Sequence, residues 1–147
     1  MAFWVISSQF MSALFAALFL FAQTSPAPAT SFRARLSPVP VETTTASRIT
    51  GSGSVMATLD GAKLTITGTF QGMKSPATIA QIHMGARGVR GPVEFDLQID
   101  KSPNGHINGS ITLTKVQIDT LRKGWYYIQI HAEQAPEGNL WGWLLPQ

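Results

Sequence analysis

The tripeptide Gln-Ile-His occurs twice in the chain, at residues 81–83 and at residues 129–131. Alternate side chains of an extended strand point to the same side, so Gln and His share one face in each copy. If the two strands are neighbours, we expect His83 and His131 to meet at one rim of the sheet. Imidazole and carboxylate groups bind zinc and copper(II). The pattern therefore predicts a metal site of His83 and His131, with Glu133 or Glu137 as a further ligand.

A second interpretation needs no metal, and it is the one we favour. Each imidazole offers one hydrogen-bond donor and one acceptor. His83 and His131 each precede a long connection, so their rings can bind loop backbone and hold these connections in place. The remaining histidine, His106, follows a Pro-Asn-Gly turn, and we expect it to be exposed and without a functional role.

The connection after His83, residues 84–92, is rich in glycine and carries Arg87 and Arg90. These arginines can hold an anionic group against loop amides, although solvated loop charges are the simpler interpretation. The predicted ligand-binding or partner-binding residues are Gln81, Arg87, Arg90, Gln129 and Glu137. No Gly-x-Ser-x-Gly motif and no evident carboxylate pair indicates catalysis.

Short strands must position these residues. Apolar and polar side chains alternate in residues 55–59, 64–70, 93–99 and 107–113. Further strands are predicted at 78–83, 125–131 and 140–145. Asp60-Gly61 is typical of a two-residue type I′ hairpin turn, and residues 102–105 and 136–139 are predicted turns. Residues 37–54 are expected to form an extended entry segment with little core of its own.

One short helix is expected at residues 115–123. Thr114 and Gln117 have the spacing of a capping box, and Leu113 and Ile118 occupy the positions of a hydrophobic staple. Gly124 is well placed to end the helix. The whole pattern predicts an all-β fold: a Greek-key or immunoglobulin-like β-sandwich of about seven or eight strands with one short helix.

Trp141 and Trp143 share a face of the last predicted strand, on either side of Gly142. Ordinary core packing is the interpretation we favour for them and for Trp125. The alternative is that the indoles anchor a protein interface, as aromatic residues often do. This alternative would suit an accessory subunit of an envelope or membrane complex.

The first residues have the character of an export signal. The run from Phe10 to Ala22 is almost wholly apolar, and Ala27-Pro28-Ala29 has the small-x-small pattern of a cleavage site. We expect a signal peptide at residues 1–29 and a single domain at residues 30–147. The alternative is an uncleaved anchor that associates with the membrane through residues 3–22.

Composition excludes several classes of protein. The chain of 147 residues has no cysteine, which excludes disulfides, thiolate metal sites and a cysteine nucleophile. Its net charge of +3 comes from scattered residues rather than a dense basic stripe, so we expect no nucleic-acid partner.

From Phe32 to Leu145 the chain resembles the CHRD domain, the module repeated in chordin and found singly in many exported bacterial proteins. The fragments that match in order include residues 32–36, Gly51-Ser-Gly53, Ile82-His83 with the glycines that follow, Leu113-Thr114, residues 127–131 and 136–138, and Gly142. Two positions depart from the family pattern. Gln81 stands where a histidine is common, and residues 138–142 read Gly-Asn-Leu-Trp-Gly in place of Gly-Glu-Ile-Arg-Gly. Both departures replace ionisable groups with neutral ones.

The resemblance implies an immunoglobulin-like or related β-sandwich and no established catalytic activity. We therefore expect an exported, periplasmic or secreted, non-catalytic protein that acts as a binding or structural module. Its partner is expected to be a protein of the envelope or extracellular space. No cofactor is expected unless the histidines bind zinc or copper.

Overall fold

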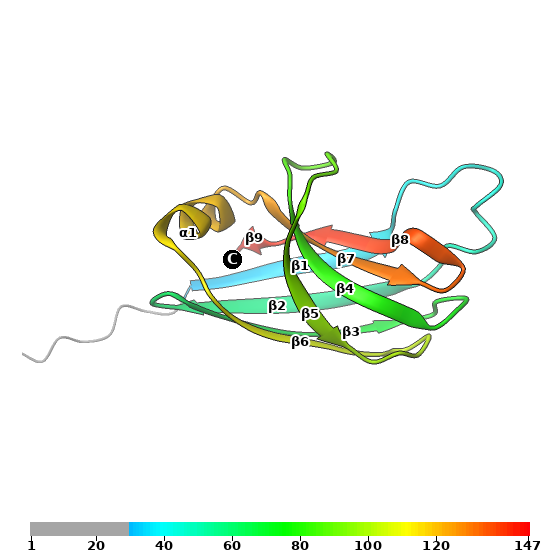
Figure 1. The fold of residues 1–147 in the computed structure, drawn as a ribbon, viewed down its shortest axis with the longest axis horizontal. Coiled ribbons are helices and arrows are strands. Elements are labelled where there is room, and N and C mark those ends of the chain that lie inside the picture. Colours follow the sequence, from blue (N-terminus) through cyan, green and yellow to red (C-terminus); the bar gives the residue numbers. More distant parts are fainter. Residues whose placement is uncertain (1–29) are drawn as a thin grey trace, which may run out of the picture.

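The computed structural model describes residues 30–147, so the predicted signal peptide or anchor at residues 1–29 lies outside the described residues. Within residues 30–147, nine strands and one helix follow in chain order (Figure 1). They are β1 (Thr30–Pro38), β2 (Ser52–Asp60), β3 (Lys63–Gln71), β4 (Ala77–Met84), β5 (Val93–Ile99), β6 (Gly105–Thr112), α1 (Lys115–Arg122), β7 (Tyr126–Ala132), β8 (Ala135–Trp143) and β9 (Leu145–Pro146).

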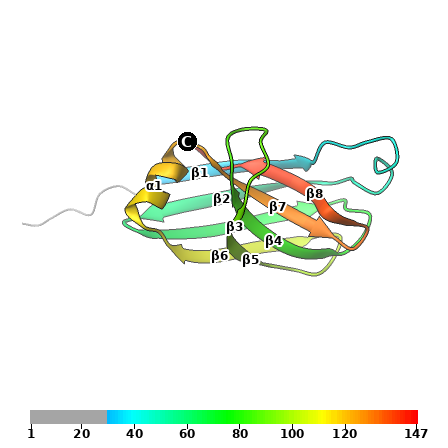
Figure 2. The ribbon, with the colours of Figure 1, turned by 45° about the horizontal axis from the view of Figure 1, so that its top comes forward.

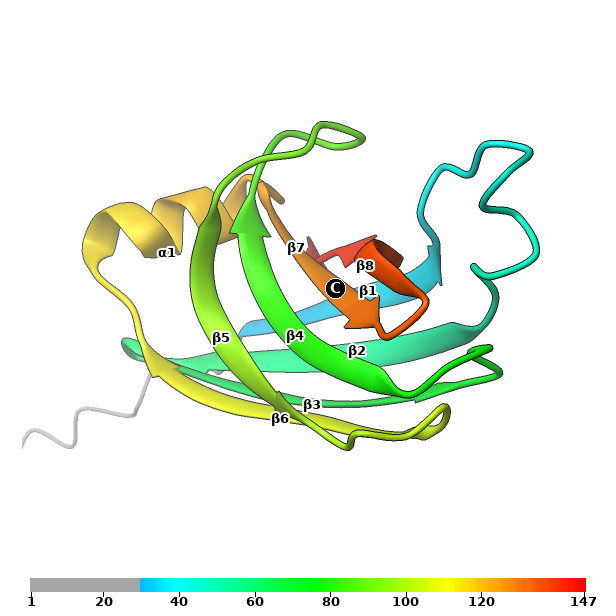
Figure 3. The same cartoon turned by 45° about the vertical axis from the view of Figure 1, so that its right-hand side comes forward.

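The sheet closes into an antiparallel barrel of eight strands, in the order β1-β2-β3-β6-β5-β4-β7-β8, with β8 paired again to β1 (Figure 3). The prediction of a two-sheet sandwich is therefore wrong, although the all-β class with one short helix is confirmed. β1 closes the barrel, because it pairs with a strand on each side. It pairs with β2 from Thr30 to Leu36 and then with β8 through Ser37 and Pro38.

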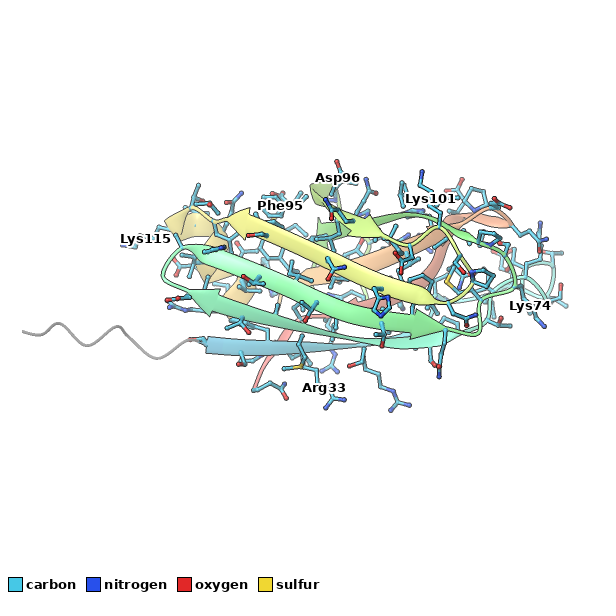
Figure 4. The ribbon with its side chains drawn as sticks, turned by 90° about the horizontal axis from the view of Figure 1, so that it is seen from below. Arg33, Lys74, Phe95, Asp96, Lys101 and Lys115 are labelled. Atoms are coloured by element: carbon cyan, nitrogen blue, oxygen red, sulfur yellow. The ribbon has the colours of Figure 1, made fainter. Side chains whose placement is uncertain are left out.

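The predicted entry segment, residues 37–54, contains the irregular segment of the structure, but the strand before it was not predicted. β1 is a full strand of nine residues that starts at Thr30, and the irregular segment covers residues 39–51. Phe32, Ala34 and Leu36 point into the barrel, whereas Arg33 and Arg35 are exposed on its outer face. Figure 4 shows Arg33 directed away from the barrel.

The core is the interior of the barrel. Every long strand contributes apolar side chains at alternate positions, among them Val55, Ala57, Leu64, Ile66, Ile82, Ile107, Ile128, Ile130 and Leu140. Burial of this apolar surface is the main stabilising contribution to the fold. No helix of residues 30–147 has the length and apolar character needed to cross a membrane.

The helix and its caps follow the prediction. The Thr114 side chain accepts a hydrogen bond from the backbone of Gln117, and the Gln117 side chain accepts one from the backbone of Thr114. Gly124 has a positive φ of 71° at the end of the helix. α1 lies at one end of the barrel (Figure 1), where Leu121 is fully buried in the core.

Two turns differ from their predictions. The β2–β3 turn is formed by Gly61 and Ala62, and only Gly61 has a positive φ, which is the pattern of a type II′ turn rather than type I′. Residues 136–139 form no turn between strands. The β7–β8 turn is Glu133-Gln134, and residues 136–139 belong to β8, where the register with β7 shifts.

Candidate functional site

The two Gln-Ile-His copies lie on neighbouring strands, as predicted, but in antiparallel register. Gln81 of β4 pairs with Gln129 of β7, so His83 stands opposite Tyr127 and His131 opposite Ile79. Ile82 and Ile130, the central residues of the two tripeptides, point into the core. The glutamines and histidines on either side of them therefore lie on the outer face of the barrel. The histidine rings lean toward each other, with centroids 6.3 Å apart and planes inclined by 31°.

Both histidines bind loop or strand backbone, as the favoured interpretation predicted. Nδ1 of His83 lies 2.9 Å from the carbonyl oxygen of Gly91, and Nδ1 of His131 lies 2.7 Å from that of Pro136. A carbonyl oxygen only accepts hydrogen bonds, so each Nδ1 carries the proton, and the lone pair of the neutral ring is on Nε2. Both Nε2 atoms are buried and have no hydrogen-bond partner among the described residues.

The loop of residues 85–92 projects from the ends of β4 and β5 (Figure 2), and hydrogen bonds hold its base against this face. The backbone N–H of Gly91 donates to the hydroxyl of Tyr127 over 2.9 Å, and Nε1 of Trp143 donates to the carbonyl of Gly85 over 3.0 Å. Gly91 also passes so close to the backbone of Met84 that a Cβ atom would collide with the Met84 carbonyl oxygen. The loop is therefore ordered by side chains of β4, β7 and β8.

The register shift in β8 supplies further acceptors. Between the pairs Ile130–Leu140 and Ala132–Ala135, β8 contains more residues than β7, so carbonyl groups of this bulge are free of the strand ladder. The carbonyl of Glu137 accepts hydrogen bonds from Nε2 of Gln129 at 3.0 Å and from Nη1 of Arg90 at 3.2 Å. Gln129 is buried, so its amide depends on this contact.

Several predicted residues take other positions. Gln81 donates to the carboxylate of Asp96 on β5 over 2.9 Å. Glu133 lies exposed in the β7–β8 turn, and Glu137 contributes its backbone carbonyl to the network. Among residues 30–147 there is no group of three His, Asp or Glu side chains placed to hold a metal ion, so neither carboxylate completes a three-ligand set with the histidines.

The exposed His106, at the start of β6, pairs with Asp100, which follows the end of β5. Its backbone N–H and its Nδ1 both approach Oδ2 of Asp100, at 2.8 Å and 3.0 Å. The backbone hydrogen bond, followed by the side-chain contact, lowers the pKa of Asp100 below its usual value. This is the only ion pair found within residues 30–147.

The sequence predictions did not include a groove of about 510 Å³ along β1 and β8. Its lining residues are Arg33, Arg35, Ser37, Arg87, Trp141, Gly142, Trp143, Leu145 and Gln147. The alternation of residues 32–36 was a usable signal, since it places Arg33 and Arg35 together on one face. Arg87 joins them from the 85–92 loop, as a predicted ligand-binding residue.

The two indoles of the groove lie on the outer face of β8, so core packing is wrong for Trp141 and Trp143. Their ring centroids are 4.8 Å apart, and Tyr127 packs against both, at 5.9 Å from Trp141 and 4.8 Å from Trp143. The guanidinium of Arg90 stands 5.6 Å from the ring of Trp141, so Arg90 is not simply a solvated charge. Trp125 is also exposed, but it lies outside this cluster, beneath the ammonium of Lys123.

Comparison with known proteins gives one match. The family model of the CHRD domain matches residues 32–144, from the third residue of β1 to just beyond the end of β8. The match includes both histidines of the pair and most of the groove residues. No curated protein and no solved structure matches the chain. The match extends over most of the chain, so this protein belongs to the CHRD domain family.

Proposed function

We propose that this protein is an exported, non-catalytic binding module whose groove between β1 and β8 holds a carboxylate-bearing glycan. The observation that carries the proposal is the composition of the groove. Three guanidinium groups, those of Arg33, Arg35 and Arg87, line it beside two indole rings.

The arginines are free to bind an anion. The only ion pair within residues 30–147 joins His106 and Asp100, so none of the three groove arginines has a carboxylate partner in that part of the chain. A guanidinium presents its N–H groups in a planar fork that matches a carboxylate, and it keeps its charge at any physiological pH. Three such groups in one groove favour a ligand with several acidic groups.

The indoles favour a sugar as the carrier of these acidic groups. A sugar ring has an apolar face of C–H groups that can pack on an aromatic ring, and hydroxyl groups at its edge. Trp143 is held by its hydrogen bond to Gly85 and Trp141 by its contacts with Tyr127 and Arg90. Rings that are fixed before binding lose little conformational entropy when a ligand arrives.

Export supports this class of ligand, because acidic polysaccharides occur outside the cytoplasm. The apolar run and the small-x-small motif in residues 1–29 are the basis for the export signal. A protein partner with an acidic segment is the second candidate, favoured by the enrichment of Trp and Arg in protein interfaces.

The test compares binding of a polyuronate with binding of a neutral polysaccharide of similar length and of polyglutamate. We expect the polyuronate to bind best and its affinity to fall as salt is added. The Arg33→Gln/Arg35→Gln variant should weaken binding by about ten-fold or more, since each lost charged hydrogen bond is worth roughly 1.5–3 kcal/mol. Arg122→Gln, on α1 and outside the groove, is the matched control.

Equal binding of the neutral polymer, or an unchanged affinity in the double variant, would show that the groove is not the glycan site. Tighter binding of polyglutamate than of polyuronate would show that the ligand of the groove is an acidic protein segment rather than a glycan. Both arginines are exposed on the barrel surface, so folding of the variant can be verified by an unchanged thermal midpoint.

A further inference from the structure

The outer face of β4 and β7 contains two nitrogen lone pairs that no hydrogen bond in the described structure uses. Within residues 30–147, three buried side-chain polar atoms lack a partner, and two of them are Nε2 of His83 and Nε2 of His131. Buried polar atoms are paired in the great majority of cases. Two unpaired atoms of the same kind, on rings that lean toward each other, therefore indicate a shared ligand.

The other ring nitrogen, Nδ1, has the kind of hydrogen-bond partner that it has in metal-binding histidines. Such histidines donate their second N–H to a carboxylate or a backbone carbonyl, which fixes the tautomer and the ring orientation. The carbonyls of Gly91 and Pro136 have this role for His83 and His131. His83 is further held by stacking on Tyr127, at a centroid distance of 5.1 Å and an interplanar angle of 18°.

The separation of the rings matches one ion shared between them. Two imidazoles bonded through Nε2 to opposite sides of an ion, at about 2.0 Å each, have centroids roughly 6 Å apart. The observed separation is 6.3 Å. The two rings are therefore close enough for one ion to bind both Nε2 atoms.

The number of ligands selects the metal. No third His, Asp or Glu side chain in residues 30–147 joins the pair. Zinc sites in proteins take four ligands. Imidazole is also a ligand for copper, and copper(I), with a closed d shell and no geometric preference from its d electrons, can be bound by two nitrogen donors alone. His83 is also sheltered from solvent, because the residue is only 8% exposed.

From these contacts we propose that His83 and His131 form a two-coordinate site for copper(I), bound through the two Nε2 atoms. The site uses none of the side chains of the β1–β8 groove, so it is independent of the proposed glycan ligand. The predicted zinc or copper site is thereby reduced to two protein ligands, without Glu133.

The test is a copper(I) titration of the purified full chain, without a histidine tag, in anaerobic competition with a chromogenic copper(I) chelator. We expect one ion per chain, and an X-ray absorption spectrum with two nitrogen scatterers. The diagnostic variants are His83→Asn and His131→Asn. The Asn amide nitrogen replaces Nδ1, so the hydrogen bond to the backbone carbonyl is kept while Nε2 is deleted.

Each Asn variant should weaken copper(I) binding by more than the roughly ten- to hundred-fold typical of losing an outer-shell partner. His106→Asn, at the exposed Asp100 pair, is the matched control and should bind as the unaltered protein does. If His83→Asn does not fold, as judged by near-ultraviolet circular dichroism, His131→Asn still decides the question because its ring is less buried.

Three outcomes would overturn the proposal: no stoichiometric copper(I) binding, binding that both Asn variants retain, or a four-coordinate spectrum. The Arg33→Gln/Arg35→Gln variant separates this result from the groove, since it should lose the polyuronate and keep the copper(I).

Discussion

The Cα atom of Gly91 faces the carbonyl oxygen of Met84 so closely that no side chain fits between them. The same stretch is closed by a hydrogen bond of 3.0 Å from the N–H of Met84 to the carbonyl of Pro92. The end of β4 and the last residues of the 85–92 loop are therefore held together at the base of the loop. His83 and Tyr127 also hydrogen-bond to the backbone of Gly91.

Replacing Gly91 by Ala should displace the loop. The added methyl would collide with backbone, which cannot move aside as a flexible side chain can, and overpacking of this kind typically costs about 1–3 kcal/mol. We expect a lower free energy of unfolding in urea and altered NMR shifts of the His83 ring. Gly88→Ala is the control. A Cβ at Gly88 meets nothing, so only its positive φ is penalised, by about 1–2 kcal/mol, and the NMR shifts of the His83 ring should stay unchanged.

A Gly91→Ala protein with unchanged stability and unchanged His83 shifts would contradict the packing described at the base of the loop. The comparison with Gly88 matters because both glycines lie in the same loop. A general loss of loop flexibility would affect both variants alike, whereas a collision with Met84 affects only one.

The tautomers of two histidines can be read directly. Because the acceptors at Nδ1 are carbonyl oxygens, we expect His83 and His131 to carry the proton on Nδ1 and the lone pair on Nε2 when the rings are neutral. Long-range proton–nitrogen NMR spectra of the metal-free protein distinguish the two tautomers. A proton on Nε2 in either ring would remove both the carbonyl hydrogen bond and the copper(I) ligand at that residue.

Stability should fall at alkaline pH because of Tyr126. Burial, with a smaller contribution from Glu94, raises the pKa of Tyr126 to about 12. The folded chain thus keeps this proton to higher pH than the unfolded chain, whose tyrosine pKa is about 10. The stabilising contribution is complete below about pH 10 and is lost as the pH rises through about 12.

The measurement is the free energy of unfolding in urea across this pH interval, together with tyrosinate absorbance. The chain has two tyrosines, so the difference between the unaltered protein and Tyr126→Phe isolates one phenol. Between about pH 10 and pH 12, the free energy of unfolding should fall less in the variant than in the unaltered protein. An unchanged slope, or a Tyr126 that titrates near its ordinary value, would contradict the burial of its hydroxyl.

Local structure was predictable where neighbouring residues alone determine it. The capping box of Thr114 and Gln117 was identified from spacing, because both hydrogen bonds join residues three positions apart. The Asp60-Gly61 hairpin was predicted with the wrong turn type. Which residues occupy the two central positions depends on the register of β2 and β3, and the pairing of Asp60 with Lys63 fixes it.

The position of the β7–β8 turn was missed for a related reason. Pro136-Glu137-Gly138-Asn139 has the composition of a turn, and a turn was predicted there. In the structure these residues form the bulge of β8, which also needs an irregular backbone. Gly138 has a positive φ of 132°, and the carbonyls of Pro136 and Glu137 accept hydrogen bonds from side chains. Turn chemistry shows that the chain departs from a regular strand but not whether the strand ends.

The sequence by itself determined the all-β class, the helix, the family and the placement of Ile82 and Ile130 opposite their neighbouring histidines, because these follow from local periodicity and ordered motifs. Only the tertiary structure decided that the sheet closes into a barrel and that Arg33 and Arg35 meet the tryptophans of β8. It also brought the His83 and His131 rings together. The physical reason is that alternation specifies which face a side chain occupies, whereas strand order and register, set by long-range packing, specify which faces meet.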